Sequence, residues 1–223
     1  MISLKAVFGN VSDKNSFVIN NAIDVDQFQF DNNKRLLIRK ELNIQPNEII
    51  LGFVGRLSSQ KNVIYLNKIL HECSKVASNI SLLIVGEGEL FEDMKSDLQK
   101  KGIFNKVKFL GNRDNVGEIM MAMDILLLPS LFEGLPLVLV EAQCTSLRCL
   151  VSDKITQLVK LTDDIEYLGI SNQDINKWVE RIISIGNAYP REITNKIQIT
   201  EKRFNIKQEA KNLEKMYKDL VYN

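Results

Sequence analysis

Residues 49–55 read IILGFVG, a run of apolar side chains on consecutive positions that ends in a glycine. The same arrangement returns at 80–86 as ISLLIVG, and shorter versions occupy 107–111, 125–129 and 149–152. A strand with one buried face alternates apolar and polar residues, whereas a strand buried on both faces is apolar throughout. The pattern therefore predicts the strands of a parallel sheet that lies between two layers of helices.

Helical periodicity fills the segments between these runs. Over 62–77, apolar residues recur every three or four positions on one face, and Gly102 ends a similar stretch over 90–101. Further helices are expected over 116–123, 137–145 and 174–185. Strands that alternate with helices of this length imply right-handed crossovers. We therefore predict a single α/β domain with a doubly wound, Rossmann-like parallel sheet.

The two ends of the chain differ from this central part. Residues 1–16 are polar and without periodicity, and a short edge strand is expected at 17–19. Asn205 can cap a final helix over 205–223, which has apolar residues on one face and mixed charges elsewhere. Because acidic residues interrupt its basic ones, we expect this helix to pack on the body of the protein and not on a membrane.

The composition excludes several classes of protein. Of the 223 residues, 45% are hydrophobic, and 29 Lys and Arg against 28 Asp and Glu give a net charge of +1. A substantial core is therefore expected, and the basic excess typical of nucleic-acid-binding proteins is missing. No apolar run reaches the roughly 20 residues of a membrane span, and the first residues do not resemble a signal peptide. Three cysteines and one isolated histidine, His71, favour neither a disulfide scaffold nor a metal site, so a reducing cytoplasm is expected.

The glycine-rich turns after the first two strands exclude two common nucleotide sites. The turn at 55–61, GRLSSQK, has Gln60 where a P-loop needs its second glycine. Asn62 stands where a P-loop needs a hydroxyl for magnesium. The GEG at 86–88 begins like a dinucleotide fingerprint, but Phe91 occupies the position of the third glycine. ATPase and NAD-binding interpretations therefore both fail.

Two cations flank the first of these turns. Arg56 follows the buried strand directly and Lys61 opens the next helix, so both side chains can meet above the carboxyl edge of the sheet. Ligands bind at that edge in open α/β sheets. Arginine presents a planar fork to phosphate oxygens and lysine a compact charge. Both residues could be ordinary surface charges, but their placement on either side of one turn favours an anion site.

A second candidate site lies at 129–142, PSLFEGLPLVLVEA. Pro136 is well placed as the first residue of a helix, whose free amides would face an anion. Glu141 lies among apolar helix neighbours, where a carboxylate is unfavourable without a bonding partner. That partner is either a nearby Arg or Lys, or sugar hydroxyls that Glu133 in the loop would also bind. Two cations, a helix start and two such carboxylates describe a nucleotide-sugar site.

In this order, these motifs resemble the retaining glycosyltransferases of the large group 1 family, which have the GT-B fold. The similarity runs from about Phe17 to the end of the chain and covers the C-terminal, donor-binding half of that fold. Among these enzymes the chain looks most like bacterial capsular or exopolysaccharide transferases. The resemblance is carried by the turns at 55–61, 86–88 and 109–111, by Glu133 followed after seven residues by Glu141, and by NNAID at 20–24, which resembles an Asn-Gly-Ile-Asp turn.

The resemblance implies a role for each matching residue. Arg56 and Lys61 would hold the donor diphosphate and stabilise the charge of the leaving group, so that no metal or other cofactor is required. Glu133 would bond hydroxyls of the donor sugar and complete the catalytic set, and Glu141 would bond the ribose. The backbone near Arg113 would contact the base, which suggests uridine. The remaining donor contacts would come from Gly55, Gly86, Gly134, Leu135, Leu137 and Val138.

The sequence departs from the family in three ways. The usual Gly-Leu-Pro after the glutamate helix is replaced by SLR at 146–148. A serine kept in the left-handed conformation there costs roughly 1 kcal/mol relative to glycine. DKIT at 153–156 replaces a Gly-Gly loop that contacts the donor sugar. The family's enzymes also have an N-terminal, acceptor-binding domain, of which 1–16 would be only a linker remnant.

The expected function is donor binding in a hexosyltransferase that builds cell-surface polysaccharide on the cytoplasmic side of the membrane. We expect the chain to bind a nucleoside diphosphate but to transfer little sugar alone, because a glycan or lipid-linked acceptor would bind the N-terminal domain. No nucleic acid is expected, and membrane contact would be peripheral at most. Two alternatives stay open: a non-catalytic nucleotide-sugar-binding module that acts with a separate acceptor-domain chain, and a sugar-nucleotide epimerase.

Overall fold

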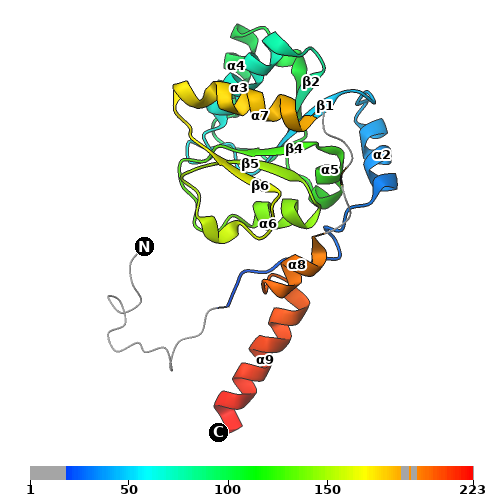
Figure 1. Cartoon of the computed structure of the whole chain (residues 1–223), viewed down its shortest axis with the longest axis vertical. Helices are drawn as coiled ribbons and strands as arrows, with labels where there is room; N and C mark the ends of the chain where they lie inside the picture. Colours follow the sequence, from blue (N-terminus) through cyan, green and yellow to red (C-terminus); the bar gives the residue numbers. More distant parts are fainter. Residues whose placement is uncertain (1–18, 187–190, 192–194, 223) are drawn as a thin grey trace.

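The centre of the molecule is a parallel sheet (Figure 1), seen in a computed structural model that describes residues 19–186, 191 and 195–222. Within these residues the sheet has six strands in the order β3-β2-β1-β4-β5-β6. They are β1 (Ile49–Val54), β2 (Ile80–Val85), β3 (Val107–Phe109), β4 (Ile125–Leu128), β5 (Arg148–Ser152) and β6 (Ile165–Leu168). The five expected strands are confirmed. The sequence did not predict β6, because only Ile165 of this short edge strand is buried.

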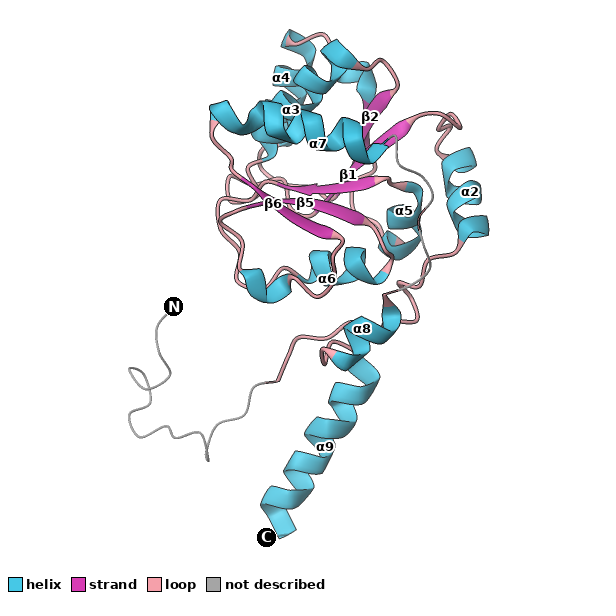
Figure 2. Ribbon diagram, in the orientation of Figure 1, coloured by secondary structure: helices cyan, strands magenta, loops and turns pink. Residues whose placement is uncertain are grey.

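Helices cover both faces of the sheet (Figure 2). One layer contains α3 (Val63–Val76), α4 (Phe91–Lys100) and α7 (Ile175–Gly186), and the other contains α2 (Asn32–Glu41), α5 (Val116–Ala122) and α6 (Leu137–Cys144). The predicted α/β fold with a doubly wound sheet is therefore confirmed. The helices α2 and α8 (Lys196–Glu201) were not predicted. The buried face of α2 contains Arg35, Ile38 and Arg39, so apolar periodicity could not reveal it.

The strand order places a crevice at one edge of the sheet. Strand β1 pairs with β2 on one side and with β4 on the other, so the connections leave β1 in opposite directions. In open α/β sheets, ligands bind at the carboxyl ends of the strands where the order reverses in this way. The core holds this edge in place, because Leu51 and Phe53 of β1 are fully buried. A ligand site is therefore expected among the loops that follow β1 and its neighbouring strands.

The last helix, α9 (Ile206–Tyr222), follows Asn205 as expected, but only its beginning is attached to the rest of the protein. Figure 1 shows it extending away from the sheet and its helices. Ile206 is 43% exposed and Tyr217 is 60% exposed. Within the described residues, the first turn of this helix is attached through the buried Glu209, whereas its later part extends away from the sheet and its helices. Periodicity shows that a helix has an apolar face, but it does not show which surface covers that face.

The segment that enters the domain lies beside the start of α9. Ile23 forms an isolated bridge with Asn205, and its amide donates to Phe204 O over 2.9 Å. Of the edge strand predicted at 17–19, only Ile19 is described, and it is not in a strand. The rest of that prediction and the linker predicted over 1–16 lie outside the described residues. None of the described helices combines the length and apolar character needed to cross a bilayer.

Candidate functional site

A hollow of about 600 Å³ lies at the carboxyl ends of β1 and β2. We call it the carboxyl-edge hollow. Four of the predicted donor-binding residues line it: Gly55, Arg56, Gly86 and Arg113. Arg113 is held there by its own loop, because its Nε donates to Leu110 O over 3.1 Å. The hollow therefore lies where the fold predicts a ligand, and residues from three loops line it.

Glycines allow two of these loops to touch. A Cβ on Gly86 would lie 2.1 Å from Gly55 O, and one on Gly88 would lie 2.3 Å from Leu57 O. The loops also share hydrogen bonds, since Leu57 N donates to Glu87 O over 2.9 Å. The glycines of the GEG motif thus allow the β2–α4 loop (86–90) to pack directly against the backbone of the β1–α3 loop (55–62). This packing explains two of the glycines that resemble a dinucleotide fingerprint.

Lys61 and Glu133 form an ion pair beside the hollow. The Lys61 Nζ lies 2.6 Å from Glu133 Oε1, and the two side chains are only 17% and 8% exposed. The Lys61 side chain passes over Gly55, since its Cε would be 3.6 Å from a Cβ there. The structure therefore brings together one of the two predicted cations and the predicted sugar-binding carboxylate, at the border of the hollow.

Further hydrogen bonds join the loops that carry this pair. Leu131 N donates to Gln60 O over 2.8 Å, and the Gln60 side-chain amide donates to Phe132 O over 3.1 Å. Asn62 Nδ2 donates to Pro129 O over 3.1 Å. Glu133 itself forms a backbone bridge with Ile155, so the DKIT loop runs beside it. Sequence reasoning assigned no role to Gln60 or Asn62, although both polar side chains flank Lys61.

Arg56 has a different partner from Lys61. Its side chain is 74% exposed, and its Nε lies 3.2 Å from Glu89 Oε2. Lys61 and Arg56 thus each contact a carboxylate from another loop, and the structure does not pair them with the same group. Glu89 carried no signal in the sequence beyond its position directly after the GEG motif.

The start of α6 presents the remaining predicted contacts. Gly134 and Leu135 lie in the loop, and Leu137 and Val138 form the first turn. The amides of this first turn lack carbonyl partners within the helix, as in any α-helix. Pro136, expected as the first helical residue, is instead the N-cap, and the helix begins one position later at Leu137.

Glu141 lies further along α6, and burial raises the pKa of its carboxyl. Among the ion pairs of the described residues, none joins Glu141 to an Arg or a Lys. The first of the two alternatives for Glu141 is thus not seen in the described structure, and its side chain keeps its capacity to accept hydrogen bonds.

The cysteines and the other acidic residues do not add a second chemistry to this site. Cys73, Cys144 and Cys149 are free and buried. Burial raises the pKa of the first two thiols to about 12, so neither is a thiolate at neutral pH. Within the described residues, no group of three His, Cys, Asp or Glu side chains is arranged to hold a metal ion.

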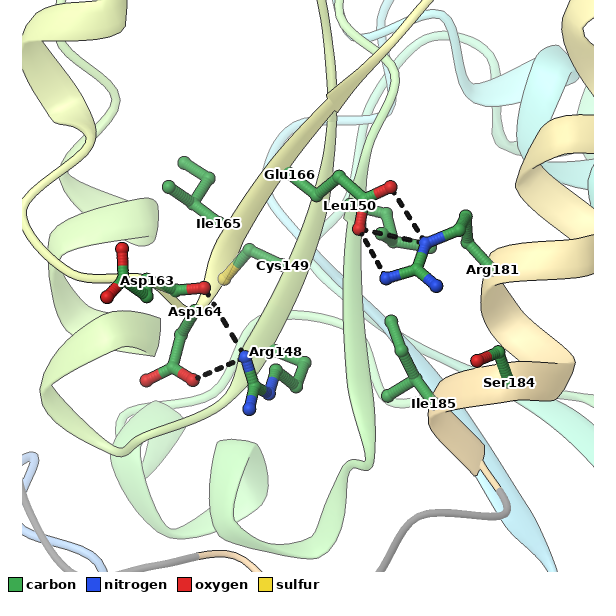
Figure 3. Close-up of a pocket in the computed structure, with 10 residues that line it drawn as sticks. All are labelled: Arg148, Cys149, Leu150, Asp163, Asp164, Ile165, Glu166, Arg181, Ser184 and Ile185. Atoms are coloured by element: carbon green, nitrogen blue, oxygen red, sulfur yellow. Dashed lines mark hydrogen bonds and ion pairs between the residues drawn. The ribbon is translucent and has the colours of Figure 1, made fainter.

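A second hollow, of about 260 Å³, lies at the opposite edge of the sheet (Figure 3). Its charged side chains face one another, and Figure 3 shows Arg181 bonded to Glu166 and Arg148 to Asp164. Since Arg148 begins β5, this hollow lies at the amino ends of the strands, away from the predicted site residues. It is therefore separate from the candidate site.

Known proteins resemble this chain over most of its length. Residues 34–215 match the family described as "Glycosyl transferases group 1". The chain is 31% identical over 215 residues to the UDP-Gal:alpha-D-GlcNAc-diphosphoundecaprenol alpha-1,3-galactosyltransferase of Escherichia coli. That alignment covers 92% of this chain and 54% of the relative, so the chain spans about half of the relative's length.

Solved structures share the fold. HepE of Anabaena, in complex with UDP and glucose, superposes with a TM-score of 0.78 at 18% identity, over 96% of this chain and 60% of HepE. The C-terminal domain of the group 1 protein LpcC from Francisella tularensis gives a TM-score of 0.63 at 16% identity, over 87% of this chain and 97% of that domain. The fold is thus the Rossmann-like one found in the C-terminal half of such proteins.

Proposed function

This chain belongs to the group 1 glycosyl transferases, and from that membership we propose that it binds the nucleotide-sugar donor of a retaining hexosyltransferase. The observation that carries the proposal is the Lys61–Glu133 pair at the border of the carboxyl-edge hollow. The structure pairs a lysine with a glutamate there, and we assign the diphosphate to the lysine and the hydroxyls of the attached sugar to the glutamate.

In this proposal, Arg56 and Lys61 bind the diphosphate. Negative charge builds on the diphosphate as its bond to the sugar breaks, and cations already in place stabilise that charge without reorganisation. When Lys61 turns toward the diphosphate, the Glu133 carboxylate accepts hydrogen bonds from sugar hydroxyls. Glu141 accepts hydrogen bonds from the ribose, and the first-turn amides of α6 contact sugar and phosphate.

The names of the similar proteins support a uridine donor and a lipid-linked acceptor. The Escherichia coli relative is named for transfer from UDP-Gal to a diphosphoundecaprenol acceptor, and HepE binds UDP. We propose a UDP-sugar donor and a role in cell-surface polysaccharide assembly at the cytoplasmic side of the membrane. Because the chain spans about half of such a relative, we further propose that the acceptor binds outside these residues and that the chain alone transfers little sugar.

Calorimetric titration of the chain with UDP and with GDP tests donor binding. We expect UDP to bind, and we expect Arg56→Ala and Lys61→Ala each to weaken that binding by about tenfold, because each removes a charge-assisted hydrogen bond of roughly 1.5 kcal/mol. Lys211→Ala, an exposed change on α9, is the control and should leave the affinity unchanged. Absence of nucleotide binding, or binding that does not respond to either variant, would contradict the proposal.

Product analysis separates this function from the epimerase alternative. After incubation of the chain with UDP-N-acetylglucosamine, we expect the nucleotide sugar to be recovered with its configuration unchanged. Formation of an epimer would replace the transferase proposal. Co-purification of a separate acceptor-domain protein with the chain would instead favour the non-catalytic binding module.

A further inference from the structure

The contact between Arg56 and Glu89 joins two loops whose backbones are packed together. Leu57, the neighbour of Arg56, donates its amide to Glu87 O over 2.9 Å and accepts from Leu90 N over 3.0 Å. Gly88 packs against the Leu57 backbone with no room for a side chain. These bonds hold the residue before Leu57 opposite the residue before Leu90. The packing of the two loops therefore brings the backbones of Arg56 and Glu89 close enough for their side chains to pair.

The two members of the pair differ in their relation to the carboxyl-edge hollow. Arg56 lines the hollow, whereas Glu89 lies beside it and is not one of its lining residues. The contact uses Nε of the guanidinium, at 3.2 Å from Glu89 Oε2. A bidentate contact with a phosphate can use the edge formed by the two terminal nitrogens. A carboxylate on Nε alone leaves that edge available.

We propose that Glu89 is a positioning residue that holds the Arg56 guanidinium by its Nε and so presents the terminal nitrogens to the donor diphosphate. This inference rests on the proposed function, because it assigns the diphosphate to Arg56. An arginine that is 74% exposed otherwise samples many rotamers, and their loss on binding opposes affinity. A guanidinium already held in one orientation loses less of this freedom.

Glu89 could also weaken donor binding through electrostatic repulsion. A carboxylate near a bound diphosphate repels it, and if that repulsion dominated, removal of Glu89 would tighten binding. Solvent weakens both effects, because Glu89 and Arg56 are both exposed, but the Nε contact acts over 3.2 Å whereas Glu89 lies outside the hollow and so further from the diphosphate. We therefore expect the positioning effect to prevail.

A double-mutant cycle measured by calorimetric titration with UDP tests this role. We expect Glu89→Ala to weaken UDP binding by about threefold, a size typical of an exposed charge pair. In the Arg56→Ala background, Glu89→Ala should have no further effect, since Glu89 acts through Arg56. Glu89→Gln keeps an oxygen for Nε and should restore most of the affinity. Glu92→Ala removes the same charge from the first turn of α4 and should leave the affinity unchanged.

Any other result of these titrations contradicts a specific part of the proposed role of Glu89. Tighter UDP binding in Glu89→Ala would show that repulsion dominates. An equal loss in both backgrounds, or a loss in Glu92→Ala, would show a general effect of charge. UDP binding that depends on Arg56 but not on Glu89 would overturn this inference alone. UDP binding that is absent from the wild-type chain, or unaffected by Arg56→Ala, would overturn the proposed function first.

Discussion

Glu141 lies in surroundings that disfavour the charged form of its carboxyl group. Burial raises the pKa of this carboxyl, and no Arg or Lys of the described residues forms an ion pair with it. In the proposed function, a ribose hydroxyl would donate a hydrogen bond to this partly buried carboxylate. Residues that bind ligands often reduce the stability of the protein that carries them.

Stability should therefore fall as the pH rises past the range in which Glu141 titrates. Its pKa in the folded chain lies above the value in the unfolded chain, so its contribution to stability is complete below the unfolded pKa and is lost as the pH rises through the folded pKa. We expect Glu141→Gln to flatten this part of the pH profile of the unfolding free energy, measured with urea, and to raise stability at pH 7. Glu180→Gln, an exposed change on α7, serves as the control.

The same variant should bind UDP about tenfold more weakly, because a hydrogen bond to a charged acceptor contributes roughly 1.5 kcal/mol or more. Higher stability combined with weaker binding is the signature of a binding carboxylate. A variant that is less stable and binds UDP normally would assign Glu141 to the structure instead.

Ser146 gives a second prediction for a single residue. It follows the C-cap of α6 with φ at +52°, the left-handed conformation that glycine adopts without strain. We expect Ser146→Gly to raise the unfolding free energy by about 0.5–1 kcal/mol in urea denaturation. In Ser96→Gly, within α4, the same change should lower stability, because glycine is unfavourable inside a helix. Destabilisation by Ser146→Gly would show that the serine side chain contributes more than the strain it causes.

Between elements, a buried charge cluster joins α2 to α5 and the start of β4. Asp124 lies 2.6 Å from an Arg35 terminal nitrogen and 3.3 Å from one of Arg39, and all three side chains are almost fully buried. Arg35 also donates to Met121 O and Met123 O at the end of α5. Cations at this end of a helix are favoured by its dipole. Buried charges rather than apolar contacts thus fix the position of α2.

Removal of the central carboxylate should release this arrangement. We expect Asp124→Ala to lower the unfolding free energy by about 3–5 kcal/mol, because it removes a buried carboxylate that pairs with two buried guanidinium groups. Asp114→Ala, an exposed change, should alter it by less than about 0.5 kcal/mol. Urea denaturation measures both values. A small effect of Asp124→Ala would mean that the other partners of Arg35 and Arg39 are sufficient to hold both side chains in place.

On the scale of the whole molecule, the sheet and its two helix layers form the core, and α9 extends from them. The first turn of α9 is attached, since Glu209 is buried and pairs with Arg203 over 2.9 Å. Further along, Tyr217 is exposed, and Figure 1 shows no part of the sheet or its helices beside this end. The end of α9 therefore adds little to the stability of the described fold.

Truncation of α9 should have an effect that depends on where the chain is cut. Deletion of 213–223 should shift the thermal unfolding midpoint by less than about 4 °C, which corresponds to roughly 1 kcal/mol for a chain of this size. Deletion of 204–223 also removes the buried Phe204 and its backbone bond with Ile23, so a much larger drop is expected. Thermal denaturation followed by circular dichroism compares the two. A large drop after the shorter deletion would show that the end of α9 packs on the protein.

Local patterns in the sequence predicted five of the six described strands, most of the helices and the residue types of the candidate site. Strands such as β1 and β2 are apolar along their whole length, and α3 has a clear apolar face, so local periodicity was sufficient. It failed for α2, whose buried face is charged, and for β6, which is only partly buried at the sheet edge. Glycine and charge patterns also identified the loops that line the hollow.

Which charged side chains of the site are in contact depends on the tertiary structure. Lys61 meets Glu133, 72 residues later, and Arg56 meets Glu89, 33 residues later, because loops from separate strands pack together at one edge of the sheet. The direction in which α9 extends likewise depends on tertiary packing and is not apparent from its own sequence. Local sequence fixes which residues are apolar, charged or glycine, whereas ion pairs and uncovered surfaces depend on how distant segments pack, and no short stretch of sequence contains that information.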